Sequence, residues 1–443
     1  MKGLTKLEKQ WVLYDVGNSA FVMLCTTIIP IYFKNIATAE GISLADSTAY
    51  LSYALSVCTI LVALMGPVFG TLADTKGYKK PMFATFFVIG VVGCLSLAIP
   101  KEWLAFLVVL VIAKTTYSMS LIFYDSMLAD VTVDERMDMV SSHGYAWGYI
   151  GSCIPFIACL LLILFAEKLG ISGVTATMIS FGITGIWWFA VTIPLLKNYN
   201  QKHWVEVKGS PVKESFSRLK KVLFKINKDK KVLYFLGAFF FYIDGVYTII
   251  DLATSYGKDV GIDDTHLLLA LLLTQIVAFP CSLLFGKFSA RFKSEKLIKV
   301  CILGYLGIAL FALQLDRAWE FWFLAVCVAV FQGAIQALSR SYFARIIPKE
   351  NSSEYFGFYD IFGKGAAFMG TMLMGISTQL SGSSRTGVGM LAVMFIIGFS
   401  CSERQRKSAA ALHDKERKLY CNRGRTGLVQ LFVIILPGQA YNV

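Results

Sequence analysis

Charged side chains are scarce in this chain of 443 residues, where Asp, Glu, Lys and Arg together make up 16%. Apolar residues make up 56% of the same chain. About a quarter of the residues in an ordinary soluble domain are charged. The composition therefore excludes an ordinary soluble domain.

Sequence signatures for several chemistries are also missing. The ten cysteines lie mostly inside apolar stretches without paired spacing, which argues against a disulfide framework or a metal site. The chain has no Gly-Lys-Ser/Thr phosphate-binding loop, so we expect no ATP drive within it. It also has no nucleophile constellation, and we therefore predict neither an enzyme nor a bound cofactor.

Long apolar stretches fill most of the chain. Several hold about 20 apolar residues, enough to cross roughly 30 Å of hydrocarbon at about 1.5 Å per residue. We predict twelve transmembrane helices, at 11–33, 48–73, 81–99, 103–129, 144–166, 176–196, 232–257, 265–290, 297–315, 319–346, 356–380 and 386–400.

The basic residues lie almost entirely in alternate gaps between these stretches. With the amino terminus placed inside, 34 of the 42 Lys and Arg residues fall in inside gaps, at the inner ends of the flanking stretches or in the termini, and each outside gap carries one. Basic residues are retained on the cytoplasmic side. We therefore expect both termini in the cytoplasm and a location in the plasma membrane. The net charge of +13 follows from this topology and does not indicate nucleic-acid binding.

The longest polar gap, 197–231, divides the stretches into six and six. This Lys-rich segment is predicted to be a cytoplasmic linker that lies on anionic lipid. The fold class we predict is an all-α polytopic membrane protein with two pseudo-symmetric six-helix halves, residues 1–196 and 232–400. Weak internal echoes support a duplication, such as Tyr14-Asp15 in the first stretch and Tyr242 with Asp244 in the seventh.

The end of the chain is atypical. The last stretch is apolar for only about 20 Å of helix before Glu403, which is short for a crossing. Residues 401–443 are predicted to form a cytoplasmic tail, whose second apolar run, Leu428 to Pro437, is too short to span a bilayer. Whether this tail is native or frame-altered stays open.

The segment that joins the second and third stretches reads GTLADTKGYKK. It resembles the inside-loop signature of the major facilitator superfamily, in which a Gly is followed by an Asp four residues later and then by Gly and basic residues. Asp74 could bond helix-end amides or a base on a neighbouring helix and hold an inner gate shut. The matching place in the second half has Ala290 where Asp74 would map. The predicted gating motif is Gly70, Asp74, Gly77, Lys79 and Lys80.

A narrower resemblance rests on several pieces that occur in order between about residues 11 and 398. They are Trp11-Val-Leu-Tyr14-Asp15, Ser141-Ser-His-Gly144, Tyr242-Ile-Asp244-Gly245, Gln336-Ala-Leu-Ser339-Arg340 and Tyr355-Phe-Gly-Phe-Tyr359. Together they resemble the vacuole-effluxer-like branch of the major facilitator superfamily. The resemblance implies transport of an amino acid or similar small solute, because fungal members are vacuolar amino-acid exporters.

Ionisable side chains inside apolar stretches are functional candidates, because their burial is costly unless they are paired or face water. Lys114 and Lys364 both fall near the middle of a stretch, where transporter sites usually lie. Asp125 is three helical turns from Lys114, too far to pair with it, so Lys114 needs another partner or a substrate carboxylate. Lys364 has Asp360 one turn earlier as a local partner.

Other polar residues inside the stretches complete the candidate set. Asp244 and Asp251 share one helix face and could serve proton coupling, since a desolvated carboxyl titrates closer to neutral pH. Asp15 and Asn18 could form a polar face or hydrogen bonds between helices. A polar stripe that could face a cavity or, at its end, an inner mouth consists of Gln332, Gln336 and Arg340.

The leading hypothesis is a secondary transporter in which two six-helix halves rock around a central site. Its partners would be a small solute such as an amino acid, a coupling proton or ion, and the lipid bilayer, and we expect a monomer. The alternative is a non-transporting membrane scaffold or sensor, in which Lys114 and Asp244 could be neutralised without loss of activity.

Overall fold

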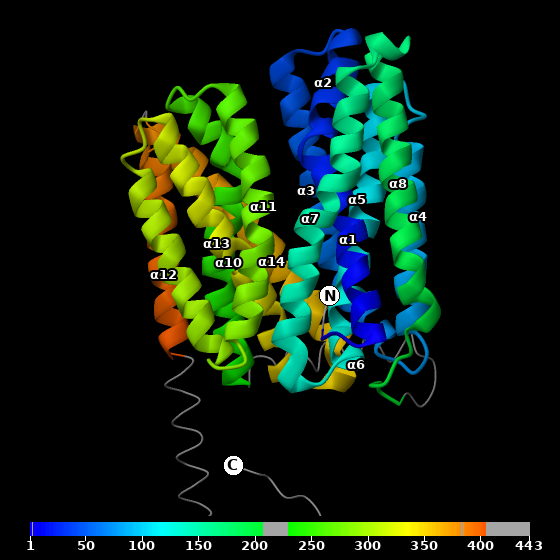
Figure 1. Ribbon diagram of the computed structural model, residues 1–443, viewed down its shortest axis with the longest axis vertical. Coiled ribbons are helices and arrows are strands. Elements are labelled where there is room, and N and C mark those ends of the chain that lie inside the picture. Colours follow the sequence, from blue (N-terminus) through cyan, green and yellow to red (C-terminus); the bar gives the residue numbers. More distant parts are fainter. Residues whose placement is uncertain (2, 207–228, 382, 384, 405–443) are drawn as a thin grey trace, which may run out of the picture.

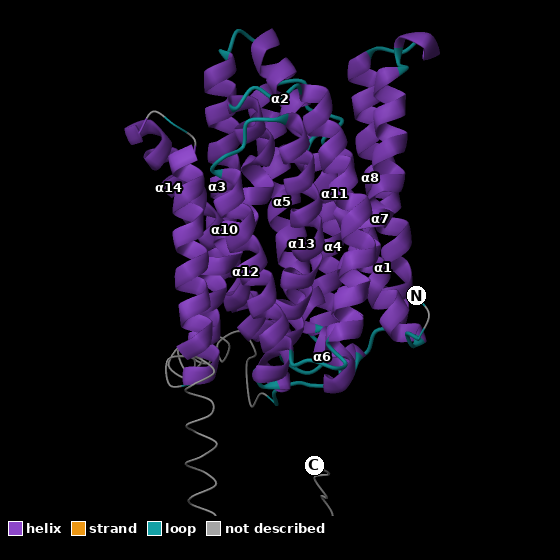
Figure 2. Cartoon of the chain, turned by 60° about the vertical axis from the view of Figure 1, so that its left-hand side comes forward, coloured by secondary structure: helices purple, strands orange, loops and turns teal. Residues whose placement is uncertain are grey.

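The structure is a computed structural model that describes residues 1–404 except residues 2, 207–228, 382 and 384. Most of the predicted linker and the predicted tail beyond residue 404 lie outside the described residues. The described part is helical, with short connecting loops (Figure 2).

Helices of the first half account for the first six predicted stretches. They are α1 (Lys6–Thr26), α2 (Ile28–Ala39), α3 (Leu44–Ala73), α4 (Lys79–Ser96), α5 (Trp103–Ser126), α6 (Leu128–Val131), α7 (Met137–Leu164) and α8 (Gly173–Asn198). The first predicted stretch is broken at Thr27, so α1 and α2 share one crossing. At its start, Thr5 and Glu8 form a capping box that fixes where α1 begins.

Helices of the second half account for the remaining six stretches. They are α10 (Lys230–Asp259), α11 (Asp264–Phe288), α12 (Ser294–Ala312), α13 (Ala318–Ile346), α14 (Ser352–Ser381) and a final helix over Arg385–Arg404. The final helix is longer than the predicted 386–400 and takes in the first residues of the predicted tail. Glu403 is accommodated because its carboxylate pairs with Lys299 of α12 at 2.5 Å.

The helices have the length and surface of membrane spans. Among the described residues, ten helical segments are long and apolar enough to cross a bilayer. Large apolar side chains such as Leu64, Ile186 and Leu380 are 64–84% exposed, which suits contact with lipid rather than water. The chain is therefore an all-α polytopic membrane protein.

The two halves lie side by side (Figure 1), and their helices meet where α3 packs against α14 and where α7 packs against α11 and α13. A matching hydrogen bond occurs inside each half. The Tyr14 hydroxyl of α1 bonds Ser120 of α5 at 2.5 Å, and Tyr242 of α10 bonds Ser339 of α13 at 2.7 Å. These equivalent contacts agree with a duplicated six-helix unit.

Candidate functional site

The polar contacts between the halves gather at one end of the bundle. We call this end, which carries the amino terminus and the turn between α3 and α4, the inner end (lower end in Figure 1). Three groups of contacts occur on this side: a first junction around Asp74, a second junction around Asp138, and a cluster around Arg340.

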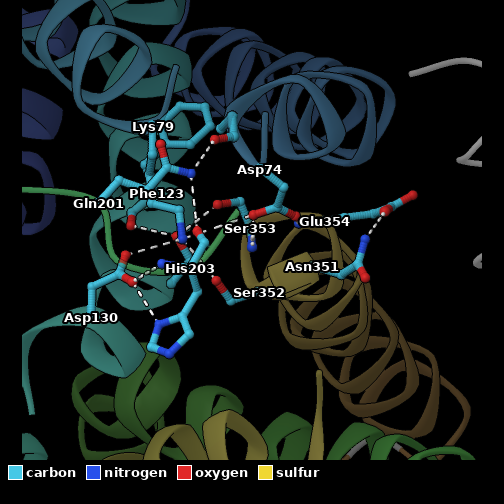
Figure 3. A network of polar contacts seen from close by, with 12 residues as sticks. Asp74, Lys79, Phe123, Asp130, Gln201, His203, Asn351, Ser352, Ser353 and Glu354 are labelled. Atoms are coloured by element: carbon cyan, nitrogen blue, oxygen red, sulfur yellow. Dashed lines mark hydrogen bonds and ion pairs between the residues drawn. The ribbon is translucent and has the colours of Figure 1, made fainter. Parts of the chain in front are cut away.

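The first junction joins the end of α3 to the beginning of α14 (Figure 3). Both Asp74 carboxylate oxygens accept backbone N–H groups, from Ser353 and from Glu354, each at 2.9 Å. These amides belong to the first turn of α14, where N–H groups lack partners within the helix and carry partial positive charge. Burial raises the pKa of Asp74 to about 6, although Lys79 and the two amides favour its charged form.

Lys79 is fully buried in the same junction. Its ammonium lies 3.8 Å from Asp74 and 3.4 Å from Asp130, and it donates a hydrogen bond to Ser352 Oγ at 2.8 Å. One ammonium group thus lies near two buried carboxylates and also donates a hydrogen bond to a residue of the other half. By contrast, Lys80 only reaches the carbonyl of Lys197 at 3.4 Å, on the exposed side.

Glycines allow the backbones of α3 and α14 to touch at this point. A Cβ on Gly70 would lie 2.5 Å from the carbonyl oxygen of Ser353, and one on Gly357 would lie 2.8 Å from the backbone of Gly66. Any larger residue would push the halves apart. Gly77 has a different role, because its φ of +80° forms the turn that brings Lys79 back towards Asp74.

The segment after α8 covers the first junction on the side of the first half. Asp130 accepts hydrogen bonds from the Tyr199 hydroxyl at 2.5 Å and from the backbone and ring nitrogens of His203, each at 2.9 Å. Gln201 accepts from the Gly77 backbone N–H at 2.9 Å. The beginning of the predicted linker therefore holds Asp130 in place beside Lys79.

The second junction joins α7 to α12 and α13. Asp138, in the first turn of α7, accepts hydrogen bonds from the hydroxyls of Ser294 at 2.6 Å and Ser341 at 2.5 Å. It also pairs with the Arg345 guanidinium. Here the acid comes from a helix of the first half, which makes up for the absence of an acid at Ala290.

Arg340 lies at the centre of the third group of contacts. Its guanidinium pairs with Asp15 at 3.2 Å and with Asp125 at 3.0 Å, and so joins α13 to α1 and α5. The same guanidinium lies over the rings of Trp11 and Tyr145, at 4.7 and 4.5 Å from their centres. Two carboxyl groups thus share one buried guanidinium.

The other polar candidates of these helices are placed around Arg340. Asn18 is buried and donates to Asp15 at 3.4 Å. Gln336 donates to the Tyr149 hydroxyl of the first half at 3.4 Å and to the carbonyl of Gln332, one turn earlier, at 3.1 Å. The stripe Gln332, Gln336 and Arg340 therefore faces the other half.

The remaining candidates lie further from the inner end and differ in exposure. Lys364 pairs with Asp360 at 2.7 Å, the local partner that the sequence suggested. Asp244 is fully buried and accepts from the Gly370 backbone N–H at 2.8 Å. Lys114 is half-buried and Asp251 is exposed, and no hydrogen bond or ion pair of either occurs within the described part of the chain.

Lys114 and Asp251 are nevertheless close enough for their charges to attract each other. Lys114 belongs to α5 of the first half and Asp251 to α10 of the second. Both lie within membrane-spanning segments. An attraction between opposite charges thus connects the two halves here, and the role of the two side chains in transport stays a prediction.

Sequence reasoning did not find three parts of the inner end. Asp130, Asp138 and the segment Tyr199 to His203 were not singled out as site residues. Each acts through a partner that is distant in sequence. The one available signal was that Asp138 lies just before the predicted stretch 144–166, close to the polar residues Ser141 and Ser142.

Comparisons with known proteins agree with this architecture. A family model described as "Vacuole effluxer Atg22 like" matches residues 45–403. The MFS-type transporter YxiO of Bacillus subtilis (strain 168) is 43% identical over 403 residues, which cover 90% of this chain and 94% of the relative. Autophagy-related protein 22-1 of Aspergillus fumigatus is 22% identical, covering 92% of this chain and 82% of the relative.

Solved structures show the same fold. The major facilitator superfamily transporter FucP in its outward conformation matches with a TM-score of 0.68 and 13% identity, over 90% of this chain and 97% of FucP. A bacterial homologue of the iron transporter ferroportin matches with a TM-score of 0.66 and 14% identity, over 92% of this chain and all of that structure. The described helices therefore adopt the major facilitator fold.

Proposed function

The chain belongs to the Atg22-like vacuole effluxer family of MFS-type transporters, and on that premise we propose that it is a secondary transporter of a small zwitterionic solute such as an amino acid. The observation that carries this proposal is the pair Lys114 and Asp251, one from each half. An amino acid carries a carboxylate and an ammonium group, which match the charges of these two side chains. Neither side chain has an ion-pair partner in the described part of the chain to compete with such a solute.

The distribution of contacts supports alternating access. The junctions around Asp74 and Asp138 close the inner end, whereas Lys114 and Asp251 are accessible within their spans. A solute that contacts both side chains would pull the halves together around itself. Rocking of the halves would then need the inner junctions to separate, which releases the solute on the other side.

Proton coupling and orientation belong to the same proposal. Asp15 and Asp125 share Arg340, so the uptake of one proton would neutralise this buried cluster.

We infer that the inner end faces the cytoplasm of a plasma-membrane protein, because basic residues accumulate at this end. A single copy contains both halves of the site, which favours a functional monomer.

Solute counterflow tests the proposal directly. The protein is reconstituted in vesicles loaded with an unlabelled amino acid, and uptake of the same labelled amino acid is followed for a panel of neutral amino acids. We expect at least one amino acid to exchange, and Lys114→Ala and Asp251→Asn each to reduce that exchange at least tenfold, since each removes a charge-assisted contact of about 1.5–3 kcal/mol.

Lys101→Ala is the matched control, because Lys101 is an exposed lysine outside the spans. Lys114→Arg keeps the positive charge at this position. Comparing it with Lys114→Ala separates the effect of losing the charge from an effect of misfolding. Melting temperatures of all variants are measured in parallel. Unchanged exchange in well-folded Lys114→Ala and Asp251→Asn would overturn the assignment of the site, and absence of exchange for the whole panel would overturn the amino-acid substrate.

A further inference from the structure

A cavity of about 500 Å³ lies at the inner end between the halves, on the side of the second half. Its wall comes mainly from the loop between α11 and α12, from the beginning of α10 and from the end of α13. The cavity is separate from Lys114 and Asp251 and takes no part in the proposed transport site.

The cavity carries excess positive charge. Lys231, Arg291 and Lys293 line it, are all exposed, and make no ion pair with any described residue. The fourth basic lining residue, Arg345, already pairs with Asp138 and donates a hydrogen bond to the Ser294 hydroxyl. Three unpaired cations in one concave wall would bind an anion.

The acidic residues of the wall do not cancel this charge. Asp134 is neutralised by Lys349 at 2.7 Å. Glu295 accepts a hydrogen bond from the Tyr342 hydroxyl at 2.6 Å and is the one remaining acid among the described lining residues. The three cations therefore outweigh a single carboxylate.

The position of the cavity indicates which anion binds. The loop lies between the last residue of α11, Phe288, and the first of α12, Ser294, at the level where the membrane-spanning helices end. Phe288 and Phe292 are 45% and 52% exposed, so apolar surface that suits acyl chains adjoins the basic wall. Aromatic side chains are enriched at this level of a membrane protein, and basic pockets there bind lipid head groups.

We propose that this cavity binds the phosphate of an anionic phospholipid from the adjacent leaflet, through Lys231, Arg291 and Lys293. The acyl chains extend from the cavity over Phe292 and Phe288 along the outer surface of α11 and α12. The bound lipid fixes the second half at the bilayer surface next to the second junction, since Ser294 and Arg345 belong to both places.

Lipid-dependent melting of the purified full chain tests the proposal. The protein in neutral detergent is titrated with short-chain phosphatidylglycerol and, separately, with phosphatidylcholine of the same chain length. A ligand of the folded state raises the melting temperature with its concentration. We expect phosphatidylglycerol to raise it more, and the double variant Arg291→Gln/Lys293→Gln to bind it about 25-fold more weakly, at about fivefold for each lost charge.

The control variant Lys101→Gln/Lys296→Gln removes two exposed lysines outside the cavity and should bind phosphatidylglycerol as the unmodified protein does. An equal loss in the control, or an equal effect of phosphatidylcholine, would overturn the site. Inorganic phosphate is titrated as a further arm. If it reproduces the full effect and the cavity variant abolishes that effect, the site binds a soluble anion and the lipid assignment is wrong.

Discussion

The two junctions at the inner end join the same halves in different ways. At the first junction, Asp74 binds backbone amides of Ser353 and Glu354, so the donors on α14 do not depend on side-chain identity. At the second junction, Asp138 binds the side chains of Ser294, Ser341 and Arg345. Contacts to the backbone need a close approach of the helices, whereas contacts to side chains can be made over a wider gap.

Because of this difference, the two junctions depend on different kinds of residue. The first junction depends on Asp74, on the buried cation Lys79 and on the glycines that let α3 and α14 touch. The second junction spreads its contacts over three partly independent donors, so no single donor should be critical. A common readout for both is hydrogen exchange of the first-turn amides of α14, which become exchangeable when the inner end opens.

The largest expected effect follows from Lys79→Met. This change leaves Asp74 and Asp130 buried without their shared cation, and breaking a buried ion group in this way costs about 4 kcal/mol. We expect the α14 first-turn amides to exchange up to about a thousandfold faster, together with a lower melting temperature.

Lys80→Met is the matched control, because Lys80 is the neighbouring residue on the exposed side of the junction. It should leave exchange at α14 close to that of the unmodified protein. Equal acceleration in both variants would show that the first junction does not depend on the buried cation.

The next effect in size tests the close approach of the backbones. In Gly357→Ala the new Cβ meets the backbone of Gly66 at 2.8 Å, whereas in Gly365→Ala it meets nothing within 4 Å. Both changes gain the same helix propensity, so their difference isolates packing between the halves. We expect Gly357→Ala to weaken closure by about 2 kcal/mol relative to Gly365→Ala, measured by exchange at α14. Indistinguishable variants would rule out a role for this contact.

The sequence was sufficient for features that depend on local pattern. All twelve apolar stretches are helical, and the turn at Gly77 has the positive φ that only glycine adopts readily. Bonding of Asp74 to helix-end amides was also expected, because the motif around it is compact. The boundary near residue 400 was wrong, since a hydropathy pattern does not show that Glu403 finds Lys299.

Features that depend on distant partners could not be predicted in this way. Asp15 and Arg340 are 325 residues apart in sequence, and Asp138 and Arg345 are 207 apart. A single sequence contains no information on which buried charges become neighbours. Lys114 could be nominated from its depth in a span and Asp251 from the helix face that it shares with Asp244, but the attraction between these two side chains needed the fold.

A smaller effect is expected at the second junction. Asp138→Asn removes the charge that attracts Arg345 and keeps one acceptor for the serine hydroxyls. Because Arg345 is 28% exposed, water replaces part of the loss, and we expect closure to weaken by about 1.5 kcal/mol. The control is Asp134→Asn, whose pair with Lys349 is more exposed and should change closure by less than about 0.5 kcal/mol. A loss in Asp138→Asn as large as in Lys79→Met would remove the distinction between the junctions.

The smallest expected effect is a pH dependence that belongs to the first junction alone. Burial raises the pKa of Asp74 from 3.8 to about 6 in the closed form, and an exposed Asp74 in the open form would return to its ordinary value. Between these values the closed form binds more protons, so closure is strengthened as the pH falls from 7 to 5, by about 1 kcal/mol. Exchange at α14 should therefore slow by about tenfold more than the intrinsic pH effect on exchange, and Asp74→Asn should show the intrinsic effect only. If Asp74→Asn retains the additional slowing, another group at the inner end is responsible, and if Asp138→Asn loses it, the second junction carries the proton instead.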